Sequence, residues 1–187
     1  MTTRAAAAER TREALLDAGL EIAERHGLAA MSVNRVVTAA GVAKGTFYVH
    51  FPDRGAFLGA LHERFHAQVA AAVGEAMVPL PPGPERLRAG METYLDLCLR
   101  HNGVKALLLE ARNDPSLADQ VAMRSQTFVE RAEPDLRAMG WPDPASAARL
   151  VVAMSAELSV TETTGGTEDA AGRAALWAFL DRLDLGR

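Results

Sequence analysis

The segment 44–54 gathers side chains that can bind a polyanion without covalent chemistry. Lysine and arginine pair with phosphate, and a glycine lets the backbone come close to a phosphate group. A threonine can offer its hydroxyl to phosphate or its methyl group to thymine. The residues of the segment with such capacities are Lys44, Gly45, Thr46, Tyr48, His50 and Arg54. Their chemistry predicts recognition of DNA rather than catalysis.

Two short helices around a glycine-centred turn must position these side chains. The first helix has an apolar face, with Ser32 as its expected N-cap, and it breaks at Gly41. The second helix is expected over 46–51, with Lys44 at its opening. The side chains expected to pack inside are Val33, Val36, Val37, Phe47 and Phe51. This arrangement is a helix-turn-helix, whose second helix normally enters the DNA major groove.

The residue types in this motif are more specific than those of an ordinary two-helix hairpin. The positions that carry the pattern are Ala40-Gly41-Val42, Gly45-Thr46, Tyr48 and His50-Phe51. Through them the chain resembles the TetR family of transcriptional regulators over residues 11–61. The resemblance implies three N-terminal helices for DNA and a larger helical domain for ligand and dimer contacts. It also implies that Tyr48 and His50 contact the DNA backbone or flanking bases and that Arg54 binds phosphate.

The sequence departs from the family pattern at three positions. Ala43 stands where serine or threonine is usual, so an N-cap worth about 1 kcal/mol is missing from the recognition helix. Arg35 stands where an acidic residue is favoured, which makes it a candidate for an additional phosphate contact. Gly55 stands where glutamate is common and weakens the first turn of the next helix. The complete set of predicted DNA contacts is Ser32, Arg35, Lys44, Gly45, Thr46, Tyr48, His50 and Arg54.

A different chemistry is offered by His62-Glu63-Arg64-Phe65-His66, which matches the HExxH motif of zinc metalloproteases. Histidines at i and i+4 share a helix face and can bind Zn²⁺, while the glutamate activates water. Glu85 is a candidate third ligand, but a proline-rich turn precedes it and no strand pattern is present to hold a peptide. We therefore expect no metal, no cofactor and no enzymatic activity. His62 and His66 are expected on the polar face of their helix, with Leu58, Leu61, Phe65 and Val69 on the buried side.

Composition and charge limit the class of protein. The chain has 187 residues, of which 49% are hydrophobic and 24% charged, as expected of a folded globular protein. The net charge of −4 argues against non-specific coating of DNA, but residues 1–54 carry +1 and the rest −5. A single cysteine, Cys98, excludes an internal disulfide, and no signal peptide or membrane-spanning stretch is visible. We expect a cytoplasmic protein.

The rest of the pattern predicts an all-α fold of roughly nine helices without a sheet. A helix-turn-helix domain is expected over 1–52, with the motif at 32–51, and a regulatory domain over 53–187. The clearest break is the proline-rich turn 79–84. Outside the motif, the expected helices cover 10–26, 53–78, the stripe 91–99, the stripe 104–111, 116–139, 144–164 and 168–185.

The middle helices of the regulatory domain hold the candidates for a ligand pocket. The family resemblance implies a small molecule bound between such helices. The candidate lining residues are Met91, Tyr94, Leu95, Cys98, Leu107, Leu108, Phe128 and Met154, with Arg112 and Gln126 for polar contacts. This mixture fits an apolar or aromatic ligand with few polar groups. Ordinary core packing is nevertheless the favoured explanation for any single one of these residues.

The last two helices are the expected homodimer interface. One helix-turn-helix contacts few base pairs, and a two-fold dimer doubles the contact on a palindromic site. The predicted interface residues are Ala148, Val151, Val152, Ser155, Ser159, Leu176, Trp177, Leu180 and Leu183. The sequence thus predicts a repressor that a small molecule releases from a palindromic operator. The alternatives are a DNA-binding protein without an effector and the zinc hydrolase.

Overall fold

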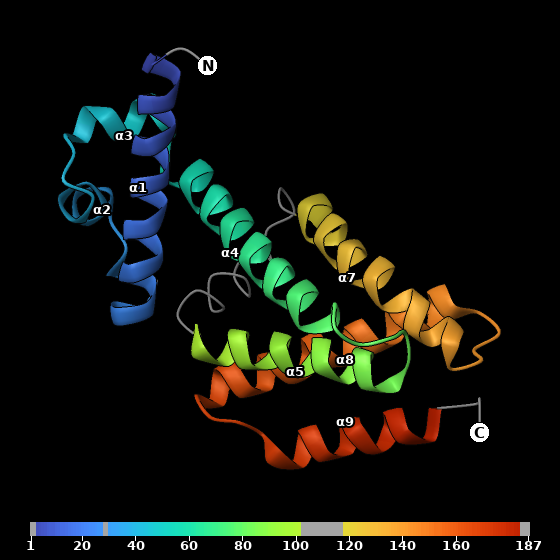
Figure 1. Cartoon of the computed structure of the whole chain (residues 1–187). Coiled ribbons are helices and arrows are strands. Elements are labelled where there is room, and N and C mark those ends of the chain that lie inside the picture. The colour runs from blue at the N-terminus through green and yellow to red at the C-terminus, as the bar shows by residue number, and fades with distance from the viewer. Residues whose placement is uncertain (1–2, 28–29, 102–117, 184–187) are drawn as a thin grey trace. The chain divides into compact units, whose positions relative to one another are not determined.

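The computed structural model describes residues 3–27, 30–101 and 118–183. Within these ranges the regular structure is helical and no strand occurs, which confirms the predicted all-α fold (Figure 1). The helices are α1 (Thr3–His26), α2 (Val33–Ala39), α3 (Lys44–His50), α4 (Arg54–Met77), α5 (Pro84–Arg100), α7 (Ala118–Ala138), α8 (Pro144–Gly165) and α9 (Ala170–Leu183). The helix predicted over 104–111 lies outside the described residues. Among the described helices, none combines the length and apolar character needed to cross a membrane.

The chain forms two compact units. Among the described residues, the first unit runs to Phe65 and holds α1, α2, α3 and the N-terminal half of α4. The second unit begins at His66 and holds the remainder of α4 together with α5, α7, α8 and α9. The helix α4 therefore contributes residues to both units.

The first helix is longer than its apolar pattern predicted, since α1 begins at Thr3 rather than at Arg10. The added turns contain the run Ala5–Ala8, and alanine has the highest intrinsic helix propensity. Most of these residues are exposed, so they leave no apolar periodicity to detect. At the other end, Gly27 adopts the left-handed conformation of a C-cap (φ 70°), as expected.

A cluster of phenylalanines forms the centre of the first unit. Phe47, Phe51 and Phe57 are fully buried, with ring centroids 5.0–5.5 Å apart. The burial of Phe47 and Phe51 confirms their predicted core role. Gly19 on α1 permits close packing against α4, because a Cβ at this position would lie 2.7 Å from the Phe57 ring.

Ion pairs reinforce the same contact between α1 and α4. The guanidinium of Arg64 donates to the carboxylate of Asp17 at 2.7 Å and also bonds Glu13. The N-terminal half of α4 is thereby joined to α1, which also packs against α2.

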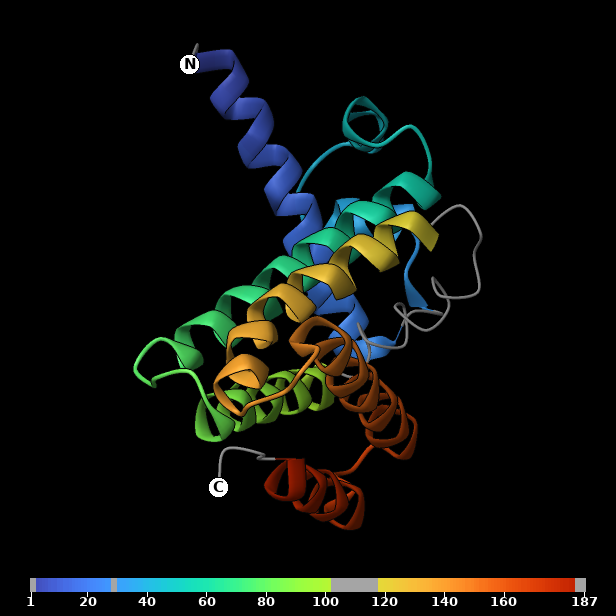
Figure 2. The same cartoon turned by 90° about the vertical axis from the view of Figure 1, so that its right-hand side faces the viewer.

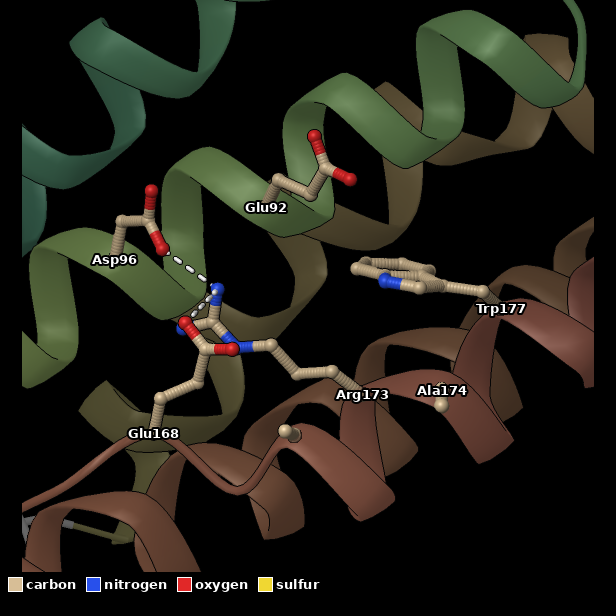
Figure 3. A pocket seen from close by; sticks show the side chains of 7 residues that line it. Glu92, Asp96, Glu168, Arg173, Ala174 and Trp177 are labelled. Atoms are coloured by element: carbon tan, nitrogen blue, oxygen red, sulfur yellow. Dashed lines mark hydrogen bonds and ion pairs between the residues drawn. The ribbon is translucent and has the colours of Figure 1, made fainter.

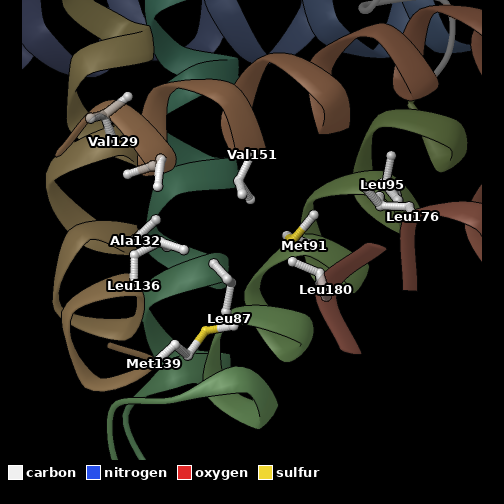
Figure 4. Close-up of a cluster of buried hydrophobic side chains, with 12 residues drawn as sticks. Leu87, Met91, Leu95, Val129, Ala132, Leu136, Met139, Val151, Leu176 and Leu180 are labelled. Carbon is white, nitrogen blue, oxygen red and sulfur yellow. The ribbon is translucent and has the colours of Figure 1, made fainter. Parts of the chain in front are cut away.

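The second unit has a separate apolar core between four helices. α8 packs against α5 and α7, and α9 packs against α5 and α8 (Figure 2). Their inward side chains form one cluster, shown in Figure 4. Its buried members are Leu87, Met91, Leu95, Val129, Ala132, Leu136, Met139, Ala147, Ala148, Val151, Leu176 and Leu180.

A buried carboxylate ties the turn before α5 to α7. Asp135 accepts a hydrogen bond from the Gly83 amide at 3.0 Å and two from Arg86, at 2.6 Å and 3.1 Å. Burial raises the pKa of Asp135, and the hydrogen bonds from Arg86 and Gly83 oppose that rise. These hydrogen bonds attach the end of the proline-rich turn to α7.

The prediction that His62 lies on the polar face of α4 is wrong. His62 is buried, whereas His66 is half-buried and Glu63 is exposed. The physical reason is helical spacing: His62 precedes Phe65 and Val69 by three and seven residues, which places all three on one face. Among the described residues, no three histidine, cysteine or acidic side chains converge on a possible metal position.

Candidate nucleic-acid interface

The turn between α2 and α3 depends on a left-handed glycine. Gly41 has φ 67°, a conformation that costs a residue with a Cβ roughly 1–2 kcal/mol. The Val42 amide donates to the Val37 carbonyl at 3.0 Å, and the Gly41 amide donates to Thr38 at 3.2 Å. These two bonds satisfy carbonyls at the end of α2 and fix the direction in which α3 leaves the turn.

The two helices of the motif begin differently. The Ser32 hydroxyl accepts a hydrogen bond from the Arg35 amide at 3.3 Å, which confirms Ser32 as the N-cap of α2. Ala43 occupies the equivalent position before α3 in an extended conformation, with no side-chain cap. In place of a side-chain cap, the Thr46 amide donates to the Ala43 carbonyl at 2.9 Å.

One side of α3 is directed into the core and the opposite side is open. Phe47 is buried, while Lys44, Gly45, Tyr48 and Val49 are exposed. Tyr48 keeps 50% of its surface, and its ring packs edge-on against Phe47 with centroids 5.4 Å apart. Its phenol is thus anchored on one side and accessible on the other, as a contact to DNA requires.

The remaining predicted contacts differ in how open they are. Thr46 and His50 are half-buried at the edge of the α3 face. Arg35 is exposed on α2, and its guanidinium donates to the Ala30 carbonyl at 3.4 Å. Arg54 is exposed at the first position of α4, directly after the N-cap Asp53, whose carboxylate accepts the Ala56 amide at 2.8 Å. The structure therefore joins Lys44, Gly45 and Tyr48 on one face of α3, with Thr46 and His50 at its edge. The other predicted contacts, Ser32, Arg35 and Arg54, lie outside α3.

Val49 is not among the DNA contacts predicted from the sequence. This valine is 81% exposed on α3, which makes it the most open large apolar side chain of the helix-turn-helix. The available signal was its spacing, four residues after Gly45 and therefore on the same face of α3.

The second unit has a hollow of about 320 Å³ between α5 and the start of α9 (Figure 3). Its lining comprises Glu92, Asp96, Glu168, Ala170, Arg173, Ala174 and Trp177. The only cationic lining group, Arg173, is held by Asp96 at 2.7 Å and by the buried Glu162. The excess of carboxylates favours cations over anions in this hollow.

Two family models match the chain in agreement with this architecture. One describes bacterial regulatory proteins of the tetR family and matches residues 15–61. The other describes a tetracyclin repressor-like C-terminal domain and matches residues 105–183. The chain belongs to the TetR family of transcriptional regulators.

Individual relatives of this TetR-family regulator agree in fold. A transcriptional regulator from Rhodococcus sp. Rha1 superposes with a TM-score of 0.79 at 23% identity, over 94% of this chain and 96% of that one. The reduced form of NemR from E. coli gives a TM-score of 0.71 at 18% identity, over 92% and 96%. The HTH-type transcriptional repressor LfrR of Mycolicibacterium smegmatis is 36% identical over 91 residues. That match covers 49% of this chain and about half of LfrR (47%).

Family membership decides between two of the predicted classes. TetR-family proteins are DNA-binding regulators and not enzymes, which confirms the prediction of a regulator.

The predicted pocket residues of the TetR-family chain are distributed over several environments. Met91, Leu95 and Cys98 are buried on the inner side of α5. Tyr94 and Phe128 are brought together, with ring centroids 5.6 Å apart, and Met154 packs against the core. Gln126 is exposed on α7 and donates to Glu130. Leu107, Leu108 and Arg112 lie outside the described residues, and none of the predicted residues lines the hollow in Figure 3.

The predicted dimer residues are mostly directed into the core of the second unit. Ala148, Val151, Ser155, Ser159, Leu176 and Leu180 are buried by the chain's own helices, and Val152 and Trp177 are half-buried. The side chain of Leu183 lies outside the described set. Ser155 and Ser159 use their hydroxyls on carbonyls of α8 itself. Side chains already covered in this way offer little surface to a second copy. The exposed positions of the same helices carry other apolar residues, notably Leu150 (66% exposed) and Phe179 (57%).

Proposed function

We propose that this TetR-family regulator is a repressor that binds a palindromic operator as a homodimer and leaves it when a small molecule binds the second unit. The observation that carries the proposal is the exposed face of α3, on which Lys44, Gly45 and Tyr48 lie together. A helix of this kind, after a fixed turn, fits the major groove.

The proposed DNA contacts divide by chemistry. Lys44, Arg35 and Arg54 supply positive charge for phosphates. Tyr48, Thr46 and His50 supply shorter polar contacts to the backbone or to base edges. The oxygen of the Ser32 hydroxyl accepts the capping hydrogen bond of α2. The O–H group of the same exposed side chain can donate to a phosphate. Repression itself is supported by the similarity to LfrR, which is described as a repressor.

The proposed dimer surface is the outer side of α8 and α9. Leu150 on α8 and Phe179 on α9 are large apolar side chains left in solvent by the subunit. In a two-fold dimer the same patch of both subunits lies in the interface. Each exposed apolar residue therefore contributes twice to the buried area. Two recognition helices then face successive major grooves of a palindrome.

The proposed effector acts on the helices of the second unit. Tyr94 on α5 touches the ring of Phe128 on α7, and its hydroxyl lies 3.3 Å from that of Ser159 on α8. These aromatic groups support the predicted preference for an apolar or aromatic ligand. Because α4 contributes to both units, ligand binding that favours one position of α4 changes the population of DNA-competent dimers.

The decisive test is selection of bound sequences from random double-stranded DNA by the full chain. A palindrome with two half-sites is expected, and Tyr48→Ala is expected to weaken its binding about 10-fold or more. Tyr48→Phe is the matched control for loss of the hydroxyl alone. Recovery of no consensus sequence would contradict operator recognition.

Release by a ligand separates the proposal from a DNA-binding protein without an effector. Preformed protein–operator complex is titrated with a panel of aromatic, apolar and cationic small molecules, and release is followed by fluorescence anisotropy. The repressor model requires at least one compound whose effect is lost in Tyr94→Ala while operator affinity is kept. Binding of a compound without any change in operator affinity would count against it.

A further inference from the structure

Val49 is an apolar side chain that lies largely outside the core of the subunit. Val49 is 81% exposed to solvent. It follows Tyr48 and lies one helical turn after Gly45. Successive residues of a helix are separated by about 100°, so Gly45 and Val49 are only about 40° apart around α3. The buried Phe47 lies on the opposite side. Val49 is therefore directed outward beside Gly45, on the side of α3 opposite to the core.

Gly45 strengthens this placement, because the fold gives no internal reason for a glycine there. Among the described residues, none lies within 4 Å of a Cβ built at Gly45, and its φ is not in the left-handed region. A glycine inside a helix makes the helix less stable than an alanine at the same position would. The missing side chain does, however, allow an external partner to come close to α3, immediately beside Val49.

The chemistry of the major groove then limits what Val49 can recognise. A valine has no hydrogen-bonding group, so it cannot read the donors and acceptors of a base edge. The one apolar feature in the major groove is the 5-methyl group of thymine. A short, stiff, β-branched side chain presents methyl groups at a defined position, which suits contact with another methyl group.

We propose that Val49 selects thymine at one position of each operator half-site by packing against its 5-methyl group. This inference rests on the operator binding proposed above and adds the residue that sets one base of the sequence. It assigns apolar recognition to Val49 and leaves polar contacts to Lys44, Tyr48 and their neighbours.

The experiment replaces each thymine of the selected operator in turn by deoxyuridine, which removes only the methyl group and keeps base pairing. Affinities of the wild-type protein, Val49→Ala and Val78→Ala are measured by fluorescence anisotropy. Val78 is the matched control, since it is 82% exposed but follows α4 in the second unit and is no part of the helix-turn-helix. At one position, loss of the methyl group is expected to weaken wild-type binding about fourfold per half-site, or about 15-fold in a symmetric pair.

Val49→Ala is expected to lose this discrimination, binding thymine and uracil operators within about twofold of each other, whereas Val78→Ala keeps it. Wild-type protein insensitive to every uracil substitution overturns the proposal and leaves operator binding intact. Discrimination retained in Val49→Ala but lost in Thr46→Ser also overturns it, because the methyl contact then belongs to Thr46. Absence of any selected operator refutes the proposed function itself. The wild-type comparison depends only on altered DNA, so it remains valid if a variant fails to fold.

Discussion

The guanidinium of Arg173 on α9 donates two hydrogen bonds to the buried carboxylate of Glu162 on α8, at 2.7 Å and 3.0 Å. A third bond from Arg173 reaches Asp96 on α5 at 2.7 Å, so one side chain joins three helices. The hydrogen bond with Glu162 raises the pKa of Arg173 further, which keeps the guanidinium charged.

Removal of this partner is the first prediction. Glu162→Ala is expected to lower the free energy of unfolding by about 3–5 kcal/mol, because a buried arginine loses its main counter-charge. The matched control is Glu21→Ala, which breaks an exposed pair with Arg25 (3.1 Å) and is expected to cost only about 0.5 kcal/mol or less. Urea unfolding followed by circular dichroism measures both. Equal losses in the two variants would contradict the structural role of the Glu162–Arg173 pair.

The two caps of the helix-turn-helix provide a second prediction, with opposite signs. Ala43→Ser adds an acceptor at the uncapped start of α3 and is expected to raise the free energy of unfolding by about 1 kcal/mol. Ser32→Ala removes the bond to the Arg35 amide and is expected to lower it by a similar amount. Thermal unfolding of the two variants measures the shifts. A decrease for Ala43→Ser would show that the backbone before α3 cannot accommodate a cap.

Substitutions at two glycines of the motif are the third prediction, since they should affect stability and DNA binding differently. Gly41→Ala is expected to cost about 1–2 kcal/mol, because Gly41 has φ 67°. Gly45→Ala is expected to stabilise the fold by about 0.4–1 kcal/mol, since its added Cβ meets no described neighbour within 4 Å. Yet Gly45→Ala should weaken operator binding, because the new methyl group holds α3 away from the DNA. Denaturant unfolding and gel-shift titration test the pair, and Gly45→Ala with unchanged operator affinity would exclude close backbone approach at this residue.

The proposed dimer surface makes a fourth prediction. Phe179→Glu places a charge on an exposed apolar position of α9 and is expected to raise the dimer dissociation constant about 30-fold or more. Val78→Glu alters a valine that is even more exposed but lies outside α8 and α9, so the dimer should persist. Sedimentation equilibrium distinguishes the outcomes. Monomers from Val78→Glu and dimers from Phe179→Glu would place the interface elsewhere.

Acid sensitivity of α8 is the fifth prediction. Asp143 caps this helix, and hydrogen bonds from Ser146 hold the pKa of Asp143 below its ordinary value of 3.8. A carboxyl whose pKa is lower in the folded state stabilises the fold above the unfolded pKa, and this stability is lost as the pH falls through the folded pKa. Asp143→Asn keeps an oxygen acceptor but does not titrate there. The difference in unfolding free energy between wild type and variant should therefore shrink below about pH 4. Parallel pH profiles would rule out this contribution.

Short-range interactions made much of the DNA-binding unit predictable. The Ser32 cap, the break at Gly41 and the Asp53 cap each involve residues at most five positions apart, so their types and order are sufficient evidence. Phe47 and Phe51 are four residues apart, a spacing that directs both to one side of a short helix.

Tertiary packing decided which side chains of the second unit are buried and which are exposed. α8 is rich in alanine, valine and serine on nearly every side, so periodicity cannot tell Val151, which is buried, from Leu150, which is exposed. The same ambiguity placed His62 on the wrong side of α4. Only the positions of α5, α7 and α9 around α8 determine which small and apolar side chains are covered. The sequence by itself therefore determined the family and the DNA-binding element through local interactions. The tertiary structure decided the faces used for the core, the acidic hollow and the proposed dimer, because burial depends on contacts between residues far apart in the chain.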